Sequence, residues 1–310
     1  MTGKISVIIP VYNAGPQFGD CLCALGSQSL PRESFKIIVV DDGSSDDSAA
    51  VAEGFGVRVI RQENRGAPAA RNTGIDAAEH PWVAFTDADC IPTRRWLEYL
   101  YRAIDGAPDG REPIGAAGPT FGYQSNTRAA RFVDLTKGLD AERHLSHPKW
   151  PFAPTGNVMY RRDALVEIGG FDERFVAYDA CDLHTRMSRP NMAFVFEPRA
   201  VVLHRHRASW GTYFQQQVGY GHGLGQFTLR YRHEIGWSLW NEMSAWGQLV
   251  RLGAEVLKRC EADQSLVNRG NAIKAFAQRI GFLRAYWSPT ERHRWNDDAL
   301  KATRLENASS

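Results

Sequence analysis

Several features that would place a chain in a specialised class are missing from this sequence. Its five cysteines, among 310 residues, form no CxxC pair, so neither a disulfide framework nor a zinc site is indicated. No apolar run approaches the ~18 residues that a membrane-spanning helix needs, and the first run, within MTGKISVIIPVYN, is too short for the core of a signal peptide. Hydrophobic residues make up 43% of the chain, which predicts a folded protein, and the pattern of cysteines predicts a reducing, cytoplasmic setting.

A large charge of one sign is also lacking, because 37 Lys and Arg stand against 35 Asp and Glu. The basic residues nevertheless concentrate towards the C-terminus: from His204 onward the chain has 15 basic and 9 acidic residues. Such a surplus suits an anionic partner such as a membrane surface, although a mixed, solvated helical face is the commoner cause. Nucleic acid is not expected as a partner, because no basic run with interleaved aromatic residues resembles a reading module.

The first half of the chain alternates short apolar runs with helical patterns. ISVIIPVY, KIIVV, VRVIRQ and WVAF are typical of strands, and helical patterns separate them. This regular order predicts an α/β fold with a mostly parallel sheet and helices on both faces. Runs that are apolar at successive positions, such as KIIVV, suit strands buried on both sides.

Unusual polar residues follow three of these predicted strands. Residues 10–13 (PVYN) end the first strand, residues 41–46 (DDGSSD) end the second, and residues 85–90 (FTDADC) end a later one. Ligands of open parallel sheets bind beyond the carboxyl ends of the strands. Asp87 and Asp89 repel each other unless positive charge lies nearby, so this edge is a candidate site for a divalent cation. A surface turn is the alternative for each motif taken alone.

The segment NRGAPAARNTG, residues 64–74, predicts a loop followed by a helix that brings Arg71 to the same edge. A planar guanidinium near a helix N-terminus matches the oxygens of a diphosphate. A surface ion pair with a nearby carboxylate is the alternative. Further along, residues 105–150 are less regular, and PTGNVMYRRDALVEIGGFDERF predicts a turn, a strand and a helix from Asp163 to Ile168. YDACDLHTRM then predicts a helix, FVFEP a strand, and the remainder amphipathic helices.

The order of these motifs resembles family 2 of the inverting glycosyltransferases, which have the GT-A fold. The match runs from Ile5 to about Arg207 and rests on VIIPVYN, VVDDGSSD, NRGAPAARNTG, FTDAD, TGN, GGFDE and VVLHRHR. The resemblance implies transfer of a sugar from a UDP-, GDP- or dTDP-sugar to an acceptor hydroxyl with inversion, in glycan or glycolipid synthesis. It divides the chain into a GT-A domain at 1–207, with a nucleotide-binding half at 1–104 and an acceptor-binding half at 105–207, and a helical region at 208–310.

Carried over by position, the resemblance assigns roles to individual side chains. Asp89 is the expected ligand of Mn²⁺ or Mg²⁺, hard cations that prefer oxygen, and Asp87 lies near the ribose or the donor sugar. His204 closes over the diphosphate or the metal, unless it is an ordinary strand-end histidine. Tyr12 stacks on the nucleobase and Asp42 accepts one of its N–H groups. The other expected positions are Pro10, Asn13 and Arg71 on the donor side and Gly156 and Asn157 on the acceptor side.

The general base is the point where this sequence departs from the family pattern. The family supplies it from a Glu-Asp pair at the start of the helix after GGFDE, but an ungapped match places Asp179 on the Glu and Ala180 on the base. A loop shifted by one residue would make Asp179 the base, which is our first choice. Asp182 is the second candidate, with an i,i+4 ion pair to Arg186 as its structural alternative. Two other functions are possible. One is a relative that binds nucleotide sugars without catalysis. The other is a nucleotidyltransferase, which is less favoured because the sequence lacks a Gly-rich triphosphate loop near its N-terminus.

The C-terminal region offers two further expectations. Gln217 and Tyr220-Gly221 resemble a Q-x-x-x-Y-G stretch that covers the acceptor channel, although packing against the core is favoured. Downstream, tryptophans at helical spacing accompany basic residues, which suits a helix in a bilayer interface at the inner face of the membrane, close to a lipid-linked acceptor. Packing on the GT-A domain or homodimerisation is the alternative for this helix. The residues that carry this pattern are Trp237, Trp240, Trp246, Leu249, Leu252, Arg251, Lys258 and Arg259.

Overall fold

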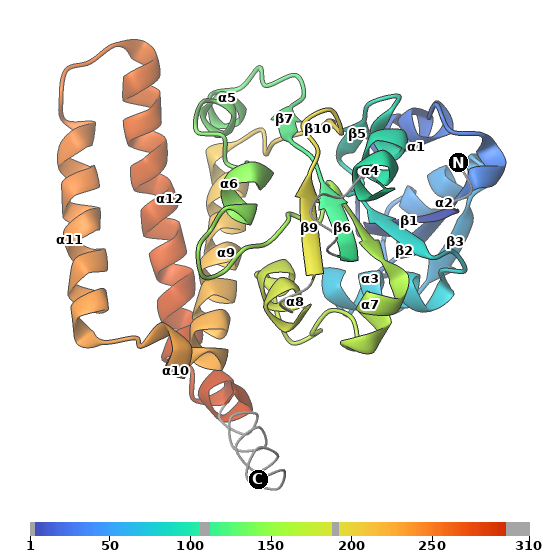
Figure 1. Ribbon diagram of the computed structural model, residues 1–310. Coiled ribbons are helices and arrows are strands. Elements are labelled where there is room, and N and C mark those ends of the chain that lie inside the picture. The colour runs from blue at the N-terminus through green and yellow to red at the C-terminus, as the bar shows by residue number, and fades with distance from the viewer. Residues whose placement is uncertain (1–3, 106–111, 188–191, 296–310) are drawn as a thin grey trace, which may run out of the picture. The chain divides into compact units, whose positions relative to one another are not determined.

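The computed structural model describes residues 4–105, 112–187 and 192–295, and it separates into two compact units (Figure 1). The sheet unit comprises residues up to Gln124, Lys137–Arg174 and Asp179–Arg205. The helical unit comprises Ser125–Thr136, Phe175–Tyr178 and the chain from His206 onward. Parts of the predicted GT-A domain (1–3, 106–111 and 188–191) and of the predicted helical region (296–310) lie outside the described residues.

The sheet unit is built on a seven-stranded sheet with the order β3-β2-β1-β4-β8-β6-β9. Strands β1 to β4 are mutually parallel, β8 runs antiparallel between β4 and β6, and β9 is parallel to β6. The predicted mostly parallel sheet is therefore confirmed. The strands are β1 (Ile5–Val11), β2 (Phe35–Asp41), β3 (Arg58–Arg61), β4 (Trp82–Phe85), β6 (Glu112–Ala117), β8 (Val158–Arg161) and β9 (Met192–Phe196).

Helices cover both faces of this sheet, because the apolar strands present side chains to both sides. Ile5, Val7 and Ile9 of β1 share one core with α1, α2 and α4, whereas Ile8 shares the other with α3, α7 and α8. This is the burial on both faces that runs such as KIIVV predict. The helices are α1 (Phe18–Gly26), α2 (Ser48–Gly54), α3 (Ala67–Ala77), α4 (Trp96–Asp105), α6 (Ala141–Leu145), α7 (Arg162–Glu167) and α8 (Asp179–Met187), with a 3-10 turn at Arg32–Ser34.

A second, three-stranded sheet lies in the same unit and has the order β5-β10-β7. Its strands are β5 (Cys90–Pro92), β7 (Thr120–Gly122) and β10 (Val202–His204). β10 pairs antiparallel with β5, and the register sets His204 opposite Cys90. Two motifs more than a hundred residues apart in the chain, FTDADC and VVLHRHR, thereby come together.

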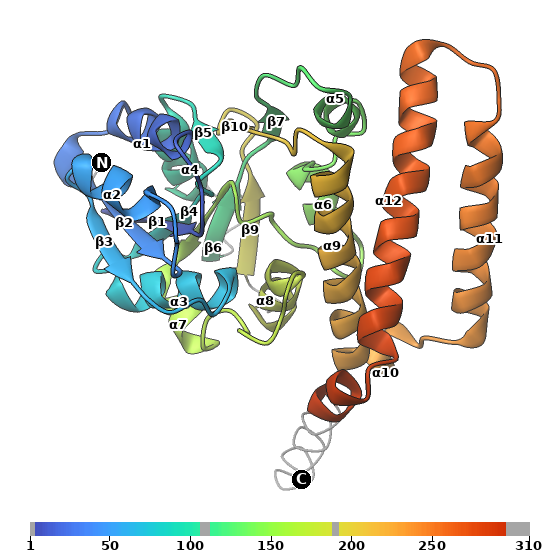
Figure 2. The ribbon, with the colours of Figure 1, turned by 180° about the vertical axis from the view of Figure 1, so that it is seen from behind.

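The helical unit contains α5 (Arg128–Leu135), α9 (Trp210–Arg230), α10 (Arg232–Ile235), α11 (Leu239–Val256) and α12 (Ala262–Tyr286). Helix α12 lies between α9 and α11 in both views (Figures 1 and 2). Glycines allow α9 and α12 to approach closely, because a Cβ at Gly221 or Gly281 would clash with the backbone of the facing helix. Gln217 is buried and accepts a hydrogen bond from Gln278 (2.8 Å), so this residue packs against α12, whereas Tyr220 of the same stretch is exposed.

Among the described residues, no helix has both the length and the apolar character needed to cross a membrane.

Candidate active site

The loops after β1 and β2 are tied together at the carboxyl end of the sheet. The backbone N–H of Asn13 donates to Ser44 Oγ (2.9 Å), and Asn13 Oδ1 accepts from the backbone N–H of Ser45 (2.8 Å). Gly15 donates its N–H to Asp46 Oδ2 (2.9 Å). The polar residues of DDGSSD thus hold the loop that follows Pro10 and Tyr12, a role that the sequence pattern alone did not reveal.

Asp42 is buried, and its carboxylate organises the next loop. It accepts hydrogen bonds from the backbone N–H groups of Arg65 (2.9 Å) and Gly66 (2.8 Å) and from the side chain of Gln62 (2.7 Å). Gly66 has φ 93°, a conformation that favours glycine, and it precedes α3 directly. Three acceptor positions of Asp42 are therefore used by the protein itself, while Tyr12 on the adjoining loop is 55% exposed.

Asp89, Cys90 and His204 form a cluster whose ligating atoms all lie within 4.8 Å of one another. His204 Nε2 is 3.3 Å from Asp89 Oδ1, and the backbone N–H of Arg205 donates to the carbonyl of Asp89 (2.9 Å). The pairing of β5 with β10 produces this proximity. Cys90 was not singled out from the sequence, although it directly follows the two aspartates. Burial, and then the charges of Asp87 and Asp89, raise the pKa of its thiol, which makes it a poor ligand beside the other two.

Arg71 links the two halves of the predicted site. Its guanidinium is 2.8 Å from Asp179 Oδ2 and 3.5 Å from Asp87 Oδ1, and it lies over the ring of Phe171. The residue is only 7% exposed, so the surface ion pair that was the alternative reading of the sequence does not describe it. Burial raises the pKa of Asp87 and the charge of Asp89 adds to this, whereas Arg71 and His204 oppose the rise.

Asp179 is the first residue of α8, and the backbone before it is unusual. Tyr178 has φ 67°, a region that bulky residues rarely adopt and that costs on the order of 1 kcal/mol. This turn starts the helix so that the Asp179 carboxylate meets Arg71, while Ala180 follows as a buried residue. The chain thus presents a carboxylate to Arg71 despite the alanine at the usual base position.

Asp182 has a different environment from Asp179. It is fully buried and pairs with Arg186 (2.8 Å), which confirms the i,i+4 ion pair that was its structural alternative. Arg186 also donates to the carbonyls of Ile168 (2.8 Å) and Gly170 (2.7 Å). Asp182 therefore anchors the turn after α7 to α8, and its position does not fit a group that faces a substrate.

The two predicted acceptor-side residues also differ from each other. Gly156 lies against the donor-side cluster, because a Cβ there would be 3.1 Å from Asp87 Oδ2. Asn157 is 1% exposed, accepts from Trp96 Nε1 (2.7 Å) and donates to the carbonyls of Pro119 and Ala200. The side-chain amide of Asn157 is thus hydrogen-bonded to α4 and to the loops that precede β7 and β10, and we assign it no direct contact with the acceptor.

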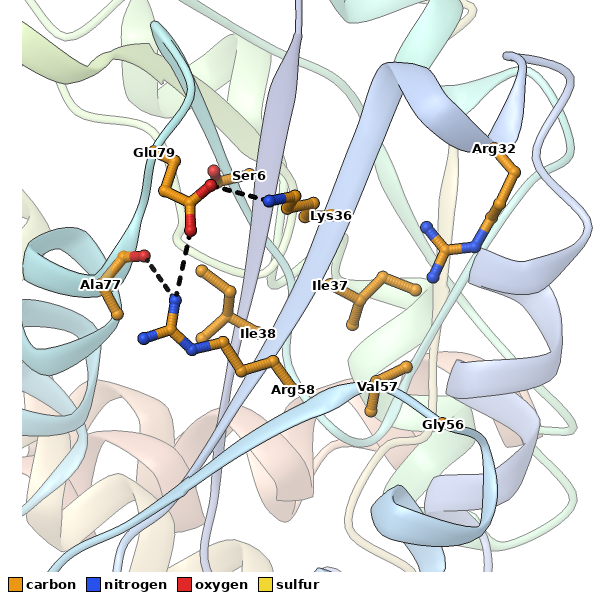
Figure 3. A pocket seen from close by; sticks show the side chains of 10 residues that line it. All are labelled: Ser6, Arg32, Lys36, Ile37, Ile38, Gly56, Val57, Arg58, Ala77 and Glu79. Atoms are coloured by element: carbon orange, nitrogen blue, oxygen red, sulfur yellow. Dashed lines mark hydrogen bonds and ion pairs between the residues drawn. The ribbon is translucent and has the colours of Figure 1, made fainter.

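A separate surface pocket of about 290 Å³ lies at the opposite, amino end of β1 to β3 (Figure 3). Lys36 pairs with Glu79 (2.7 Å), and Arg58 lies 3.7 Å from the same carboxylate and donates to the carbonyl of Ala77. The side chains of this ion-pair group are more than half exposed. None of the residues predicted for the site lines this pocket.

Comparison with known proteins provides independent information on the family. A family model described as glycosyl transferase family 2 matches residues 6–169. Glycosyltransferase AglE of Haloferax volcanii is 30% identical over 225 residues, which cover 71% of this chain and 72% of that protein. Pre-mycofactocin glycosyltransferase of Mycobacterium tuberculosis is 28% identical over 237 residues, 73% of this chain and 48% of that protein.

Solved structures share the fold at low sequence identity. The mannosyltransferase PcManGT of Pyrobaculum calidifontis, solved with GDP-Man and Mn²⁺, is 19% identical with a TM-score of 0.55, over 100% of this chain and 81% of that one. Residues 1–349 of S. aureus TarS, solved with UDP-GlcNAc, are 17% identical with a TM-score of 0.54, over 91% of each chain. Likeness at this level concerns the fold, and the GT-A fold predicted from the sequence is confirmed.

Proposed function

The chain belongs to glycosyl transferase family 2 and is a glycosyltransferase with a nucleotide-sugar donor, and we propose that its reaction is metal-dependent and inverts the anomeric carbon. The acceptor hydroxyl oxygen attacks the anomeric carbon while the bond to the diphosphate breaks. The hydroxyl proton passes to a carboxylate, and the nucleoside diphosphate leaves. The product is a glycan or a glycolipid.

The residues of the Asp89–His204 cluster fit a divalent cation by their chemistry. A carboxylate oxygen and an imidazole nitrogen, 3.3 Å apart and partly exposed, are suitable ligands for Mn²⁺ or Mg²⁺. The PcManGT complex, which contains Mn²⁺, supports a cation of this class. When bound, the cation would neutralise the charge that develops on the departing diphosphate. Asp87, next to this cluster, would face the ribose or the sugar, and Tyr12 the nucleobase.

We assign the general base to Asp179, and the observation that carries this assignment is its ion pair with Arg71 (2.8 Å). Arg71 also lies 3.5 Å from Asp87, so one guanidinium bridges the Asp179 carboxylate and the donor-side aspartate. A base must come within about 3 Å of the attacking hydroxyl, which requires a carboxylate at this edge of the sheet. Asp182 does not meet this requirement, because it is fully buried in its pair with Arg186.

Arg71 acts as a positioning residue in this scheme. Its planar fork holds the carboxylate of Asp179 and leaves a second amino group directed at Asp87. The guanidinium of Arg71 could also donate to the phosphate oxygens of a diphosphate that binds beside Asp89. Arg71 therefore couples donor binding to the orientation of the base.

Release of nucleoside diphosphate from UDP-, GDP- and dTDP-sugars, measured with Mn²⁺ and a hydroxyl acceptor, tests the assignment. Asp179→Asn should bind the donor as the wild type does but lose turnover by roughly 10²- to 10⁴-fold, the usual contribution of a general base. Asp182→Asn is the matched control and should keep turnover in its folded fraction. Wild-type turnover by Asp179→Asn would remove Asp179 from the role of base.

A further inference from the structure

Helix α11 has an apolar side that does not face α12. Its half-buried residues Glu242, Leu249 and Leu252 share one stripe, and Glu242 pairs with Arg279 of α12, which identifies this stripe as the inner one. Exposed apolar residues recur every seven positions at Met243, Val250 and Leu257, about a quarter turn around the helix from Glu242. The exposed fractions along that outer side are 76% for Trp240, 55% for Met243, 75% for Val250 and 86% for Leu257, which directly follows the helix.

The outer side of α11 is also poor in charge. Among the exposed side chains that the structure describes within α11, Arg251 is the charged one, and none is acidic. A helix side that only contacts water normally carries many charged residues, and a contiguous apolar patch indicates an interaction surface. Trp246 belongs to the inner contact instead, because its N–H donates to Glu242 (3.1 Å) and Arg279 of α12 lies over its ring.

The helical unit that carries this surface has a surplus of basic residues. Residues 206–295 contain 12 Lys and Arg against 6 Asp and Glu. Lys258 and Arg259 follow α11 and are exposed, although Glu255 offsets one of these charges by pairing with Lys258. Basic residues around an apolar stripe complement a surface that is both apolar and anionic.

We propose that the outer side of α11 binds an anionic lipid bilayer, with the helix lying in the plane of the interface. Met243, Val250 and Leu257 enter the acyl region, because burial of apolar side chains favours it. Trp240 lies at the level of the head groups, where an apolar ring with one polar N–H group is best accommodated. This surface is independent of the reaction, since it contains none of the residues assigned to the active site.

A second copy of the chain is the other occupant that an apolar helix side suggests, and the charges argue against it. Pairing of two α11 helices through this side would bring two Arg251 side chains into one interface. It would also bring together two units with the same basic surplus. An anionic bilayer meets the same charges with the opposite sign.

Flotation of the full-length protein with phosphatidylcholine vesicles, with and without phosphatidylglycerol, tests the proposal. The wild type should float with the anionic vesicles, and Trp240→Ser/Val250→Ser/Leu257→Ser should bind at least about tenfold more weakly, since these exposed side chains supply the apolar contact. Arg251→Glu/Arg259→Glu should lose the preference for phosphatidylglycerol. The matched control, Phe55→Ser/Val166→Ser, removes exposed apolar residues outside α11 and should float as the wild type does.

Two outcomes would overturn the proposal. The first is a wild type that remains with the unbound fraction in both vesicle preparations. The second is a dimer, detected by light scattering, that the triple variant of α11 abolishes, because the surface would then belong to a second copy. Glycosyl transfer to a soluble acceptor should be the same in the triple variant and in the wild type, which separates this test from that of the active site.

Discussion

The two ends of the same sheet each carry a cluster of charged side chains. The clusters differ in burial and in how far apart in the sequence their paired residues lie. At the carboxyl end, Arg71 is buried and pairs with Asp179, 108 positions further along the chain. At the amino end, Lys36 and Arg58 are more than half exposed and share Glu79. The hollow of about 290 Å³ is at the amino end (Figure 3).

This difference shows that a hollow surface is a weaker guide to a site than buried charge. Ion pairs in solvent cost little to form and contribute little, so the amino-end cluster needs no ligand to explain it. Burying Arg71 and Asp179 is expensive unless the two groups are paired or serve a function. The residues predicted for donor and metal binding, such as Asp89 and His204, gather with the buried cluster.

Paired substitutions at the two ends sharpen the comparison, and the largest effect is expected at Asp89. Asp89→Ala removes the carboxylate assigned to the metal and should lower kcat/KM for glycosyl transfer by on the order of 10³, equivalent to about 4 kcal/mol of transition-state stabilisation. Glu79→Ala, a carboxylate at the amino end, should change kcat/KM less than about twofold. Equal losses in both variants would erase the distinction between the ends.

The second effect is on stability and concerns the buried ion pair behind the site. Asp182→Asn leaves Arg186 without its carboxylate and should lower the free energy of unfolding by about 3 kcal/mol. Urea unfolding followed by circular dichroism measures the change. A loss below about 1 kcal/mol would indicate that Asp182 is not the structural anchor described above.

The third effect separates two arginines that differ in burial. Arg71→Lys keeps the positive charge but loses the fork that reaches both aspartates, and activity should fall roughly 10- to 100-fold. Arg58→Lys should leave the steady-state kinetics unchanged, because Arg58 lies at the amino end. If Arg71→Lys retained full activity, a point charge would suffice and the bidentate geometry would carry no function.

The smallest effect is expected at the exposed pair of Lys36 and Glu79. Lys36→Ala should lower the free energy of unfolding by less than about 1 kcal/mol, and 1 M salt should remove most of the difference because it screens exposed charges. Thermal unfolding of both proteins at low and high salt measures it. A larger loss of unfolding free energy that persists in high salt would show that the amino-end cluster stabilises the fold, contrary to the prediction.

Periodicity and strand order were sufficient to predict the sheet and most of the residues at its carboxyl end. Apolar runs such as KIIVV have a strong pattern, and parallel strands bring their carboxyl ends to one edge, so the proximity of DDGSSD and FTDADC followed. The contact of His204 with Asp89 depends on β5 and β10. Strands of three residues carry no readable period, and in the sequence only the family resemblance pointed to His204.

Side-chain roles within the site were less predictable than positions. Asp42 and Asn157 are both buried and hydrogen-bonded to backbone groups, which no local pattern indicates because their partners come from other parts of the chain. The ion pair of Arg71 with Asp179 has the same cause.

The tryptophan pattern predicted from the sequence combines exposed and packed residues. Trp240 is exposed, whereas Trp237 packs on Phe282 of α12 and Trp246 lies against Arg279. Only the position of α12 separates the two sides of α11.

The most direct test of the central account is a thermal-shift measurement with UDP, GDP, dTDP and CDP, each with and without Mn²⁺, on the wild type and on Asp89→Ala. A nucleotide at ~100 times its Kd adds about 2.7 kcal/mol, which corresponds to roughly 4 °C for a chain of this size. We predict a shift that one nucleotide produces only with Mn²⁺ and that Asp89→Ala abolishes, with Glu79→Ala unaffected. A shift that persists in Asp89→Ala, or none with any nucleotide, would contradict a metal-dependent donor site at the carboxyl end of the sheet.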